Sequence, residues 1–376
     1  MSPTSKLLAE LIALPSVNPA FLPERHPHAG EGRVAEFLAT VAAKAGLEVE
    51  FQEALPHRPN LLVRLLPRSR PVQRVLLAPH LDTVNVADES QFTPRKQGAR
   101  LYGRGACDTK GSVAAMLAAL CDLARAKPRP EKTEIVLAGL IDEENAQSGS
   151  RALVKAGFKA DLAIVGEPTR LQAVTAHKGS LWLQVETRGR AAHGATPQLG
   201  RNAVLAMARV VDFLETDYAA QLRQRRHPLL GPATVSVGSI AGGSQPNIVP
   251  DRCVITVDRR TLPGETETGV CRQIAALLRG RKLSASVTGQ KLAPCLPLET
   301  NLKLPLVRQF LRSLGQARPV GVNFFCDAAV LAQGAIPSVV FGPGDIAQAH
   351  TADEWISLAS LERARACLCQ FLKSLP

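Results

Sequence analysis

The sequence predicts an α/β protein that carries a smaller α+β domain inserted into it. In residues 1–178, short apolar segments alternate with helical segments, which is typical of a largely parallel sheet covered by helices. Between 179 and 292 the pattern changes to the alternation of antiparallel strands, and from 293 to 376 the α/β pattern returns. We therefore expect one domain from 1–178 plus 293–376 and a second domain from 179–292.

The first segment alternates helices with short apolar strands. "KGSVAAMLAALCDLARA" (110–126), rich in Ala and Leu, is the clearest helix. Apolar spacing predicts further helices at 5–13, 32–46 and 149–156, and strands at 60–66, 74–78, 134–140 and 161–167. Ligands of such sheets bind at the carboxyl ends of the strands, so these ends are where a functional site is expected.

In the inserted segment the elements follow in the order β-α-β-β-α-β. Strands are expected at 181–190, 233–243, 252–260 and 283–288, and helices at 201–215 and 265–279. This order is that of a ferredoxin-like α+β domain. The returning α/β segment is expected to contain a helix at 302–314, the buried strand "PSVVFG" and a closing helix at 357–374.

Composition and charge restrict the class of protein. The 376 residues are 45% hydrophobic and 21% charged, as in globular proteins. The net charge of +12 would attract anions, but the arginines are scattered and aromatic residues make up only 4%, so no nucleic-acid partner is expected. No apolar run has transmembrane length and the N-terminal stretch reads as an amphipathic helix, so no membrane partner is expected. Eight cysteines without a CxxC pair favour a reducing, cytoplasmic location.

"VLLAPHLDTVNV" (75–86) is an apolar run followed by His80 and Asp82. Side chains at i and i+2 of an extended segment point to the same face. Taken alone, the pair fits either a surface contact in a loop or a metal-binding imidazole that a carboxylate orients. Further ligands elsewhere in the chain decide between the two.

More acidic and imidazole side chains follow the expected strand ends or precede the long helix. They are Asp108, Asp142, Glu143, Glu144, Glu167 and His350. Their convergence at one edge of the sheet would be costly without cations, because the carboxylates repel one another. Imidazole and carboxylate ligands suit zinc or, less selectively, cobalt or manganese. Two ions bridged by a carboxylate would activate a water and polarise a carbonyl.

The adjacent pair Glu143-Glu144 adds an argument about catalysis. Neighbouring side chains diverge, so the two rarely bind the same metal ion. One of them can be a ligand while the other faces the activated water as a general base.

The chain resembles the dinuclear zinc family that contains acetylornithine deacetylase, succinyl-diaminopimelate desuccinylase, aminoacylase and glutamate carboxypeptidase. The resemblance extends over nearly the whole chain and implies a zinc-peptidase-like catalytic domain with an inserted lid and dimerisation domain. It depends on "PHLDTV" (79–84), "GRGACDTKG" (103–111), "DEEN" (142–145), "GEPT" (166–169), "HGATPQLGRNAV" (193–204), "GGSQPNIVPDRC" (242–253), "DRRTLPGE" (258–265) and "FGPGDIAQAHTADEWI" (341–356).

The resemblance assigns metal-binding roles to five residues. It implies that Asp108 bridges two Zn²⁺ ions, for which Co²⁺ can substitute. His80 and Glu167 would complete one ion's ligands, and Glu144 and His350 the other's.

The resemblance also assigns roles beside the metals. Asp82 would accept the second N–H of His80 and fix its tautomer. Glu143 would deprotonate the water and later protonate the leaving amine. A cis peptide bond is implied between Asp108 and Thr109.

Four residues match substrate-contacting positions of the family. His193 matches a histidine that, in dimeric relatives, reaches the partner subunit's site and stabilises the oxyanion, which implies a homodimer formed through the inserted domain. Asn247 and Arg260 match positions that bind the substrate carboxylate, although the assignment of Arg260 can slip by one to Arg259. Gly344 would offer its backbone to the same carboxylate.

Two cysteines stand near these positions. Cys326 precedes Asp327 where several relatives carry Ser or Thr, which would alter acyl preference if the side chain touches the substrate. Cys107, beside Asp108, is read as a small packed side chain, with a soft group near the metals as the alternative.

The implied activity is hydrolysis of the amide of a small-molecule N-acyl amino acid. "GPGDIAQAH" and "DRRTLPGE" look most like acetylornithine deacetylase, an enzyme of arginine biosynthesis. A succinyl-diaminopimelate desuccinylase would need a second cationic contact, and a metallo-dipeptidase or carboxypeptidase also fits. A non-catalytic binding protein on this scaffold would be expected to lack Glu143 or a ligand, and all are present.

Overall fold

The computed structural model describes residues 1–290 and 293–376, and these form two compact units. The first unit consists of Met1–Thr175, Thr300–Val320 and Cys326–Pro376, and the second of Ala176–Glu299 and Gly321–Phe325. The sequence placed the boundaries after residues 178 and 292, and residue 292 falls outside the described residues. The sequence did not single out Gly321–Phe325 as part of the second unit.

The larger sheet has four parallel central strands with antiparallel strands on either side. Its order is β1-β2-β6-β3-β7-β17-β8-β15, with β16 paired to β8. The pairs β6–β3, β3–β7 and β7–β17 are parallel. The predicted α/β fold around a largely parallel sheet is therefore confirmed. The strands are β1 (Glu48–Leu55), β2 (Arg58–Leu65), β3 (Gln73–Pro79), β6 (Thr133–Gly139), β7 (Leu162–Gly166), β8 (Val174–His177), β15 (Leu298–Glu299), β16 (Val320–Val322) and β17 (Ser338–Val340).

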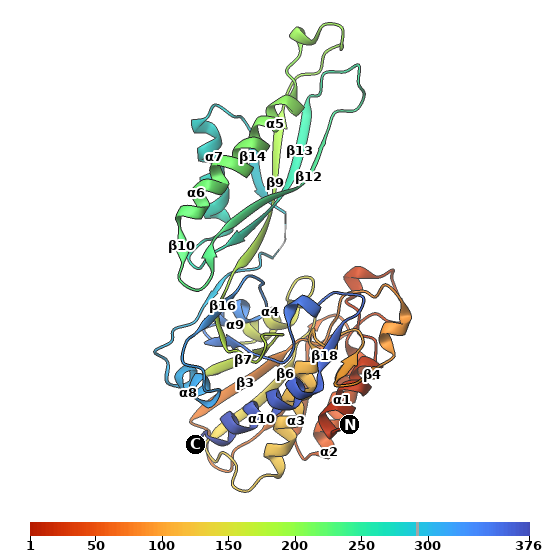
Figure 1. Ribbon diagram of the computed structural model, residues 1–376, viewed down its shortest axis with the longest axis vertical. Helices are drawn as coiled ribbons and strands as arrows, with labels where there is room; N and C mark the ends of the chain where they lie inside the picture. Colours follow the sequence, from red (N-terminus) through yellow and green to blue (C-terminus); the bar gives the residue numbers. More distant parts are fainter. Residues whose placement is uncertain (291–292) are drawn as a thin grey trace. The chain divides into compact units, whose positions relative to one another are not determined.

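A layer of helices packs on the sheet through one hydrophobic core, which includes Val75 and Leu77 of β3. In Figure 1 helices α3 and α10 run side by side over the strands, and they are in direct contact. The intervening Leu76 is equally buried but lies outside this core, as fits a strand covered on both faces. The helices of this layer are α1 (Pro3–Ile12), α2 (Gly32–Lys44), α3 (Lys110–Arg125), α8 (Pro305–Ser313) and α10 (Leu358–Lys373).

Two shorter helices, α4 (Ser148–Lys155) and α9 (Ala328–Gln333), pack against each other. They also contact β1, β7 and β17. Their buried Leu153 and Leu331 lie outside the core formed with α3 and α10.

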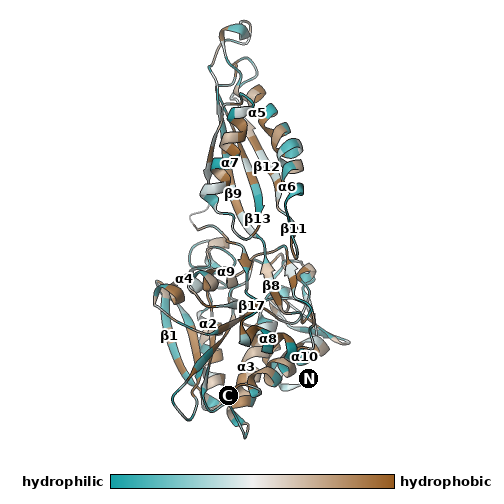
Figure 2. Ribbon diagram, turned by 90° about the vertical axis from the view of Figure 1, so that its left-hand side faces the viewer, coloured by the Kyte–Doolittle hydropathy of each residue, from teal (hydrophilic) through white to brown (hydrophobic). Residues whose placement is uncertain are grey.

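Strand β1 was not predicted from the sequence. From Glu48 to Gln52 its residues alternate glutamate or glutamine with apolar side chains, and the strand in Figure 2 carries both hydrophilic and hydrophobic residues. The strand is at the edge of the sheet, where one face meets water, so its acidic residues are tolerated. Because of its polar side chains, the segment lacks the apolar run by which other strands were predicted. It pairs with β2 from Glu48 to Leu55, with an irregularity between Glu53 and Leu55.

The second unit contains a four-stranded antiparallel sheet in the order β12-β13-β9-β14. Helices α5 (Ala203–Phe213) and α7 (Glu267–Gly280) share one core with it. The predicted order β-α-β-β-α-β is confirmed in β9 (Gly179–Arg188), α5, β12 (Thr234–Gly242), β13 (Arg252–Thr261), α7 and β14 (Ser286–Gly289).

The helix expected at 201–215 begins and ends differently. The side chain of Asn202 accepts a hydrogen bond from the amide of Leu205 (2.9 Å), so Asn202 caps the helix and α5 begins at Ala203. A π-helical turn at Leu214–Tyr218 then leads into α6 (Ala219–Gln224). No Gly or Pro breaks the helical path between residues 214 and 224.

Neighbouring parallel strands bring three functional segments to one edge of the larger sheet. Pro79 at the end of β3 pairs with Gly166 at the end of β7, and a bridge joins His80 to Leu140 after β6. The segments that follow these strands carry His80, Glu143-Glu144 and Glu167. Within the described residues, no helix is long and apolar enough to cross a membrane.

Candidate metal centre

Two groups of side chains with metal-ligand chemistry share Asp108. One consists of His80, Asp108 and Glu167, and the other of Asp108, Glu144 and His350. Within each group the ligand atoms lie within 4.8 Å of one another. The structure thus brings together all the residues that the sequence singled out as metal ligands.

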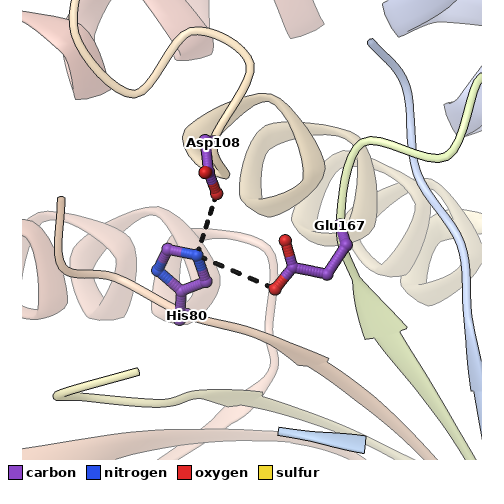
Figure 3. A group of neighbouring side chains, drawn as sticks. All are labelled: His80, Asp108 and Glu167. Carbon is purple, nitrogen blue, oxygen red and sulfur yellow. Dashed lines mark hydrogen bonds and ion pairs between the residues drawn. The ribbon is translucent and has the colours of Figure 1, made fainter. Parts of the chain in front are cut away.

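His80 lies between two carboxylates at the end of β3. Its Nε2 is 3.1 Å from Oδ1 of Asp108 and 3.8 Å from Oε1 of Glu167, and Figure 3 shows the three side chains converging. The imidazole is almost completely buried. Although burial opposes protonation, the surrounding carboxylates raise the pKa of His80 well above its usual value.

Asp82 lies on the other side of the His80 ring. Nδ1 of His80 is 3.0 Å from the main-chain oxygen of Asp82 and 3.3 Å from its carboxylate. The carboxylate also accepts hydrogen bonds from the amides of Glu143 and Glu144, both 3.1 Å long. Burial would raise the pKa of Asp82, but His80 and these bonds hold it below its usual value. Asp82 therefore fixes both the imidazole and the acidic loop.

Asp108 connects the two groups through its two oxygens. Oδ1 faces His80, and Oδ2 lies 3.3 Å from Nε2 of His350. The two imidazoles overcome the effect of burial and lower the pKa of Asp108. The peptide bond between Asp108 and Thr109 is cis, as the family resemblance implies.

Glu144 and His350 complete the second group. Nε2 of His350 lies 3.2 Å from the Glu144 carboxylate. Hydrogen bonds to Asp108 and Glu144 raise the pKa of His350 to about 10, although its side chain is 54% exposed. The first group is enclosed, whereas the second is open to solvent at His350.

Glu143, the neighbour of Glu144, belongs to neither group of ligands. Glu143 is 8% exposed, and burial, with the charges of Glu167, Asp327 and Glu144, raises its pKa well above the usual value. Burial likewise raises the pKa of Glu167.

Asp142 belongs to the same acidic run but is held away from the two groups. It accepts hydrogen bonds from Asn18 and from the hydroxyl of Ser148.

The donor set fits bound divalent cations. Two imidazoles face carboxylates at hydrogen-bond distance, and the pKa of Glu143, Glu144 and Glu167 is raised because nearby negative charges and burial disfavour ionisation. A cation in each group would remove this cost. Imidazole nitrogen and carboxylate oxygen are ligands of zinc and of related transition metals.

His193 and Asn247 belong to the second unit. His193 is exposed and forms a bridge with Ile248, and the amide of Gly194 donates to the main-chain oxygen of Asn247 (2.7 Å). The two predicted substrate residues are therefore neighbours in space on adjoining loops.

The two candidate arginines of β13 have different environments. Arg259 is completely buried, donates to the hydroxyl of Tyr218 (3.2 Å) and pairs with Glu265. Arg260 is one-third exposed and pairs with Asp258 of its own strand at 2.9 Å. Arg259 is committed to the core of the second unit, so Arg260 is the better candidate for binding an anion.

Gly344 and Cys107 are packed against each other. Gly344 has φ +91°, and a Cβ at this position would lie 2.5 Å from the Cys107 sulfur. The Cys107 thiol points to the main-chain oxygen of Asp345 (3.3 Å), and burial raises its pKa. These contacts favour the interpretation of Cys107 as a packed side chain. Cys326 is also fully buried, and burial raises its thiol pKa well above the usual value.

Sequence reasoning gave no role to three buried polar residues here. Asn18 donates to both Asp82 (2.7 Å) and Asp142 (2.9 Å). Asp327, whose pKa burial raises to about 7, acts electrostatically on Glu143. Glu354 binds the loop that ends at Asp108. Their partners lie far away in the sequence, so the local pattern around each residue did not indicate a role.

Sequence comparisons identify relatives over most of the chain. The pattern described as Peptidase family M20/M25/M40 matches residues 76–374. An acetylornithine deacetylase of Edwardsiella ictaluri is 32% identical over 97% of this chain and 96% of its own length. Another, of Myxococcus xanthus, is 32% identical over 73% of this chain and 72% of its own.

Solved structures share the fold at lower identity. A tripeptidase of Staphylococcus aureus superposes with a TM-score of 0.78 at 21% identity, covering 98% of this chain and 97% of that one. An M20 family metallo-carboxypeptidase of Sulfolobus solfataricus gives 0.76 at 19% identity, covering 99% of both chains. A dinuclear metal-binding M20 peptidase of Bacillus subtilis gives 0.71 at 12% identity, covering 98% and 96%.

Zinc binding is expected to release protons at pH 8. In the metal-free protein the imidazole of His350 keeps its proton up to a pKa of about 10, whereas a metal-bound imidazole is neutral. The affinity for zinc should therefore increase as the pH rises toward that pKa. Calorimetric titration with zinc at pH 8 in two buffers, phosphate and Tris, should give different binding enthalpies. The difference should equal the difference between the two buffers' ionisation enthalpies for each proton released. Equal binding enthalpies would contradict the prediction.

Proposed function

The chain belongs to peptidase family M20/M25/M40 and is a hydrolase of amide bonds, and from this premise we propose that it deacylates an N-acyl amino acid. The preferred substrate is N-acetylornithine, because the relatives at 32% identity are acetylornithine deacetylases. The observation that carries the chemical part of the proposal is the pair of imidazole–carboxylate groups joined at Asp108.

In the proposed centre, His80, Asp108 and Glu167 would hold one zinc ion, and Asp108, Glu144 and His350 would hold another. Cobalt is expected to substitute for zinc, since it accepts the same ligand types. When bound, the two ions would lower the pKa of a water molecule and polarise the substrate carbonyl. Asp82 keeps the His80 ring oriented through Nδ1, which leaves Nε2 to face the metal.

Glu143 is proposed to move the proton. It takes a proton from the attacking water as the carbon–oxygen bond forms, and it gives that proton to the nitrogen as the carbon–nitrogen bond breaks. The second proton of the water leaves the carboxyl product and is taken up by the amine, so the products at neutral pH are a carboxylate and an ammonium group. Burial raises the pKa of Glu143, which favours its acceptance of a proton from the water.

Arg260, Asn247 and Gly344 are proposed to bind the substrate carboxylate. The Arg260 guanidinium is partly exposed and pairs with the carboxylate of Asp258 on its own strand. A planar guanidinium can hold both oxygens of a carboxylate. Gly344 can offer its backbone closely because it has no Cβ.

We propose that the chain forms a homodimer through the second unit, which also serves as a lid. Strand β12 is an edge of the four-stranded sheet, and Ile240 on it is 56% exposed. Leu205 on α5 is equally exposed. An unpaired edge with apolar neighbours is suited to pairing with a second copy. His193 would then stabilise the oxyanion in the partner subunit's site.

Other members of the family suggest a second candidate function. The similar solved structures include a tripeptidase and a metallo-carboxypeptidase, which favours a peptidase as the alternative to a deacetylase. A desuccinylase is the further alternative. A cytoplasmic location is proposed because the eight cysteines include no CxxC pair, which favours a reducing compartment.

The substrate is tested by measuring amine release with zinc or cobalt supplied. We expect N-acetylornithine to exceed N-succinyl-diaminopimelate, N-acetylmethionine and a dipeptide by about a hundredfold in kcat/KM, or about 2.7 kcal/mol. Preference for the dipeptide would favour the peptidase.

In the Glu143→Ala variant we expect both metals to be retained and kcat to fall by about a thousandfold. Wild-type turnover in the variant would exclude Glu143 as the general base.

The role of His193 is tested by mixing two inactive variants. We expect His193→Ala and Glu143→Ala homodimers to be nearly inactive alone and to regain activity once subunits exchange. A mixed dimer contains one site with an intact Glu143 and a His193 donated by the other subunit. A mass of about 40.2 kDa, that of one chain, or no regained activity in demonstrated mixed dimers would refute the arrangement.

A further inference from the structure

The buried carboxylate of Glu354 lies in the segment that joins His350 to strand β18 (Trp355–Ser357). Glu354 is only 1% exposed. No step of the proposed mechanism uses it. Because a buried charge is costly unless it is paired, its partners indicate what it does.

The partners of the Glu354 carboxylate all lie in the loop that ends at Asp108. Oε1 accepts hydrogen bonds from the amides of Cys107 (2.8 Å) and Asp108 (2.9 Å). Oε2 accepts from the amide of Gly105 (2.9 Å) and the guanidinium of Arg104 (2.7 Å). One carboxylate thus satisfies buried amides that would otherwise lack acceptors.

Strand pairing joins the same two segments. Trp355 of β18 lies opposite Tyr102 of β5 (Arg100–Tyr102), and the main-chain oxygen of Glu354 accepts from the amide of Gly103 (3.0 Å). The Arg100 guanidinium lies 3.8 Å from the centroid of the Trp355 ring. The chain before Asp108 and the chain after His350 are therefore held against each other.

We infer that Glu354 is a positioning residue that fixes Asp108 relative to His350 and thereby sets the affinity of the second group for its metal ion. The inference rests on the proposed function. Glu354 accepts a hydrogen bond from the amide of Asp108 and follows His350 by four residues. Oδ2 of Asp108 and Nε2 of His350 lie 3.3 Å apart. Ligand distances in metal sites are defined to within about 0.2 Å, so a small shift of the loop weakens binding.

The competing interpretation is that Glu354 contributes only to folding. Glu134 offers a matched control in the same unit, since it is also buried and also bound by arginines. It accepts from Arg64 (2.9 Å) and Arg74 (2.7 Å). It lies at the start of β6, whereas the centre is beyond the ends of the strands. Loss of the Glu134 charge should therefore lower the free energy of unfolding without changing the affinity of the metal centre for zinc.

The test is a titration of metal-free protein with zinc against a chromophoric chelator, for the wild type, Glu354→Gln and Glu134→Gln. In Glu354→Gln one oxygen becomes an NH₂ group that cannot accept from the loop amides. In this variant we expect the zinc ion of the group formed by Asp108, Glu144 and His350 to bind at least tenfold more weakly than in the wild type. We also expect kcat to fall and KM to change less than threefold. The visible spectrum of the cobalt-loaded protein should change in the same variant.

The controls separate positioning from folding. We expect Glu134→Gln to unfold at a lower denaturant concentration with zinc affinity within twofold of the wild type. Glu354→Asp, which keeps the charge but is one methylene shorter, should recover part of the affinity, and it replaces Glu354→Gln if that variant does not fold. Zinc affinity within twofold of the wild type in the folded Glu354 variant would overturn the inference about Glu354 and leave the proposed function standing. A wild type that binds no zinc would overturn both the inference and the proposed function.

Discussion

The arrangement of this protein depends on the repulsion between carboxylates at the carboxyl edge of its larger sheet. Asp108, Glu143, Glu144 and Glu167 are gathered where parallel strands end, in surroundings that exclude most water. The imidazoles of His80 and His350 face this cluster and partly balance its charge. Such a cluster is stable where cations neutralise it, and the same lack of solvent strengthens any electrostatic effect on a bound substrate.

The supporting residues of the cluster also connect it to distant parts of the chain. Asp82 binds the His80 ring and the amides of Glu143 and Glu144, and Asn18 in turn binds Asp82. Glu354 binds the loop before Asp108. The centre is thus held by buried polar bonds whose loss would leave unsatisfied charges, so these supports are as necessary to the geometry as the ligands themselves.

The sequence predicted the sheet, the inserted domain and the ligand cluster because each has a local pattern. Apolar runs followed by acidic or imidazole residues mark strand ends, and these ends converge in any such sheet. The sequence assigned Arg260 but left a slip to Arg259 open, since the assignment depends on which face of β13 meets Tyr218 and Glu265. Asn18 and Glu354 were missed because their partners are distant in sequence and only the tertiary fold brings them together.

The most direct test of the account is anomalous diffraction at the zinc absorption edge from crystals of the zinc-loaded protein. The account predicts two peaks about 3.5–4 Å apart, with the Asp108 carboxylate between them. One peak should also be bound by His80 and Glu167, and the other by Glu144 and His350. A fully loaded crystal with a single peak, or with peaks away from these residues, would contradict the account.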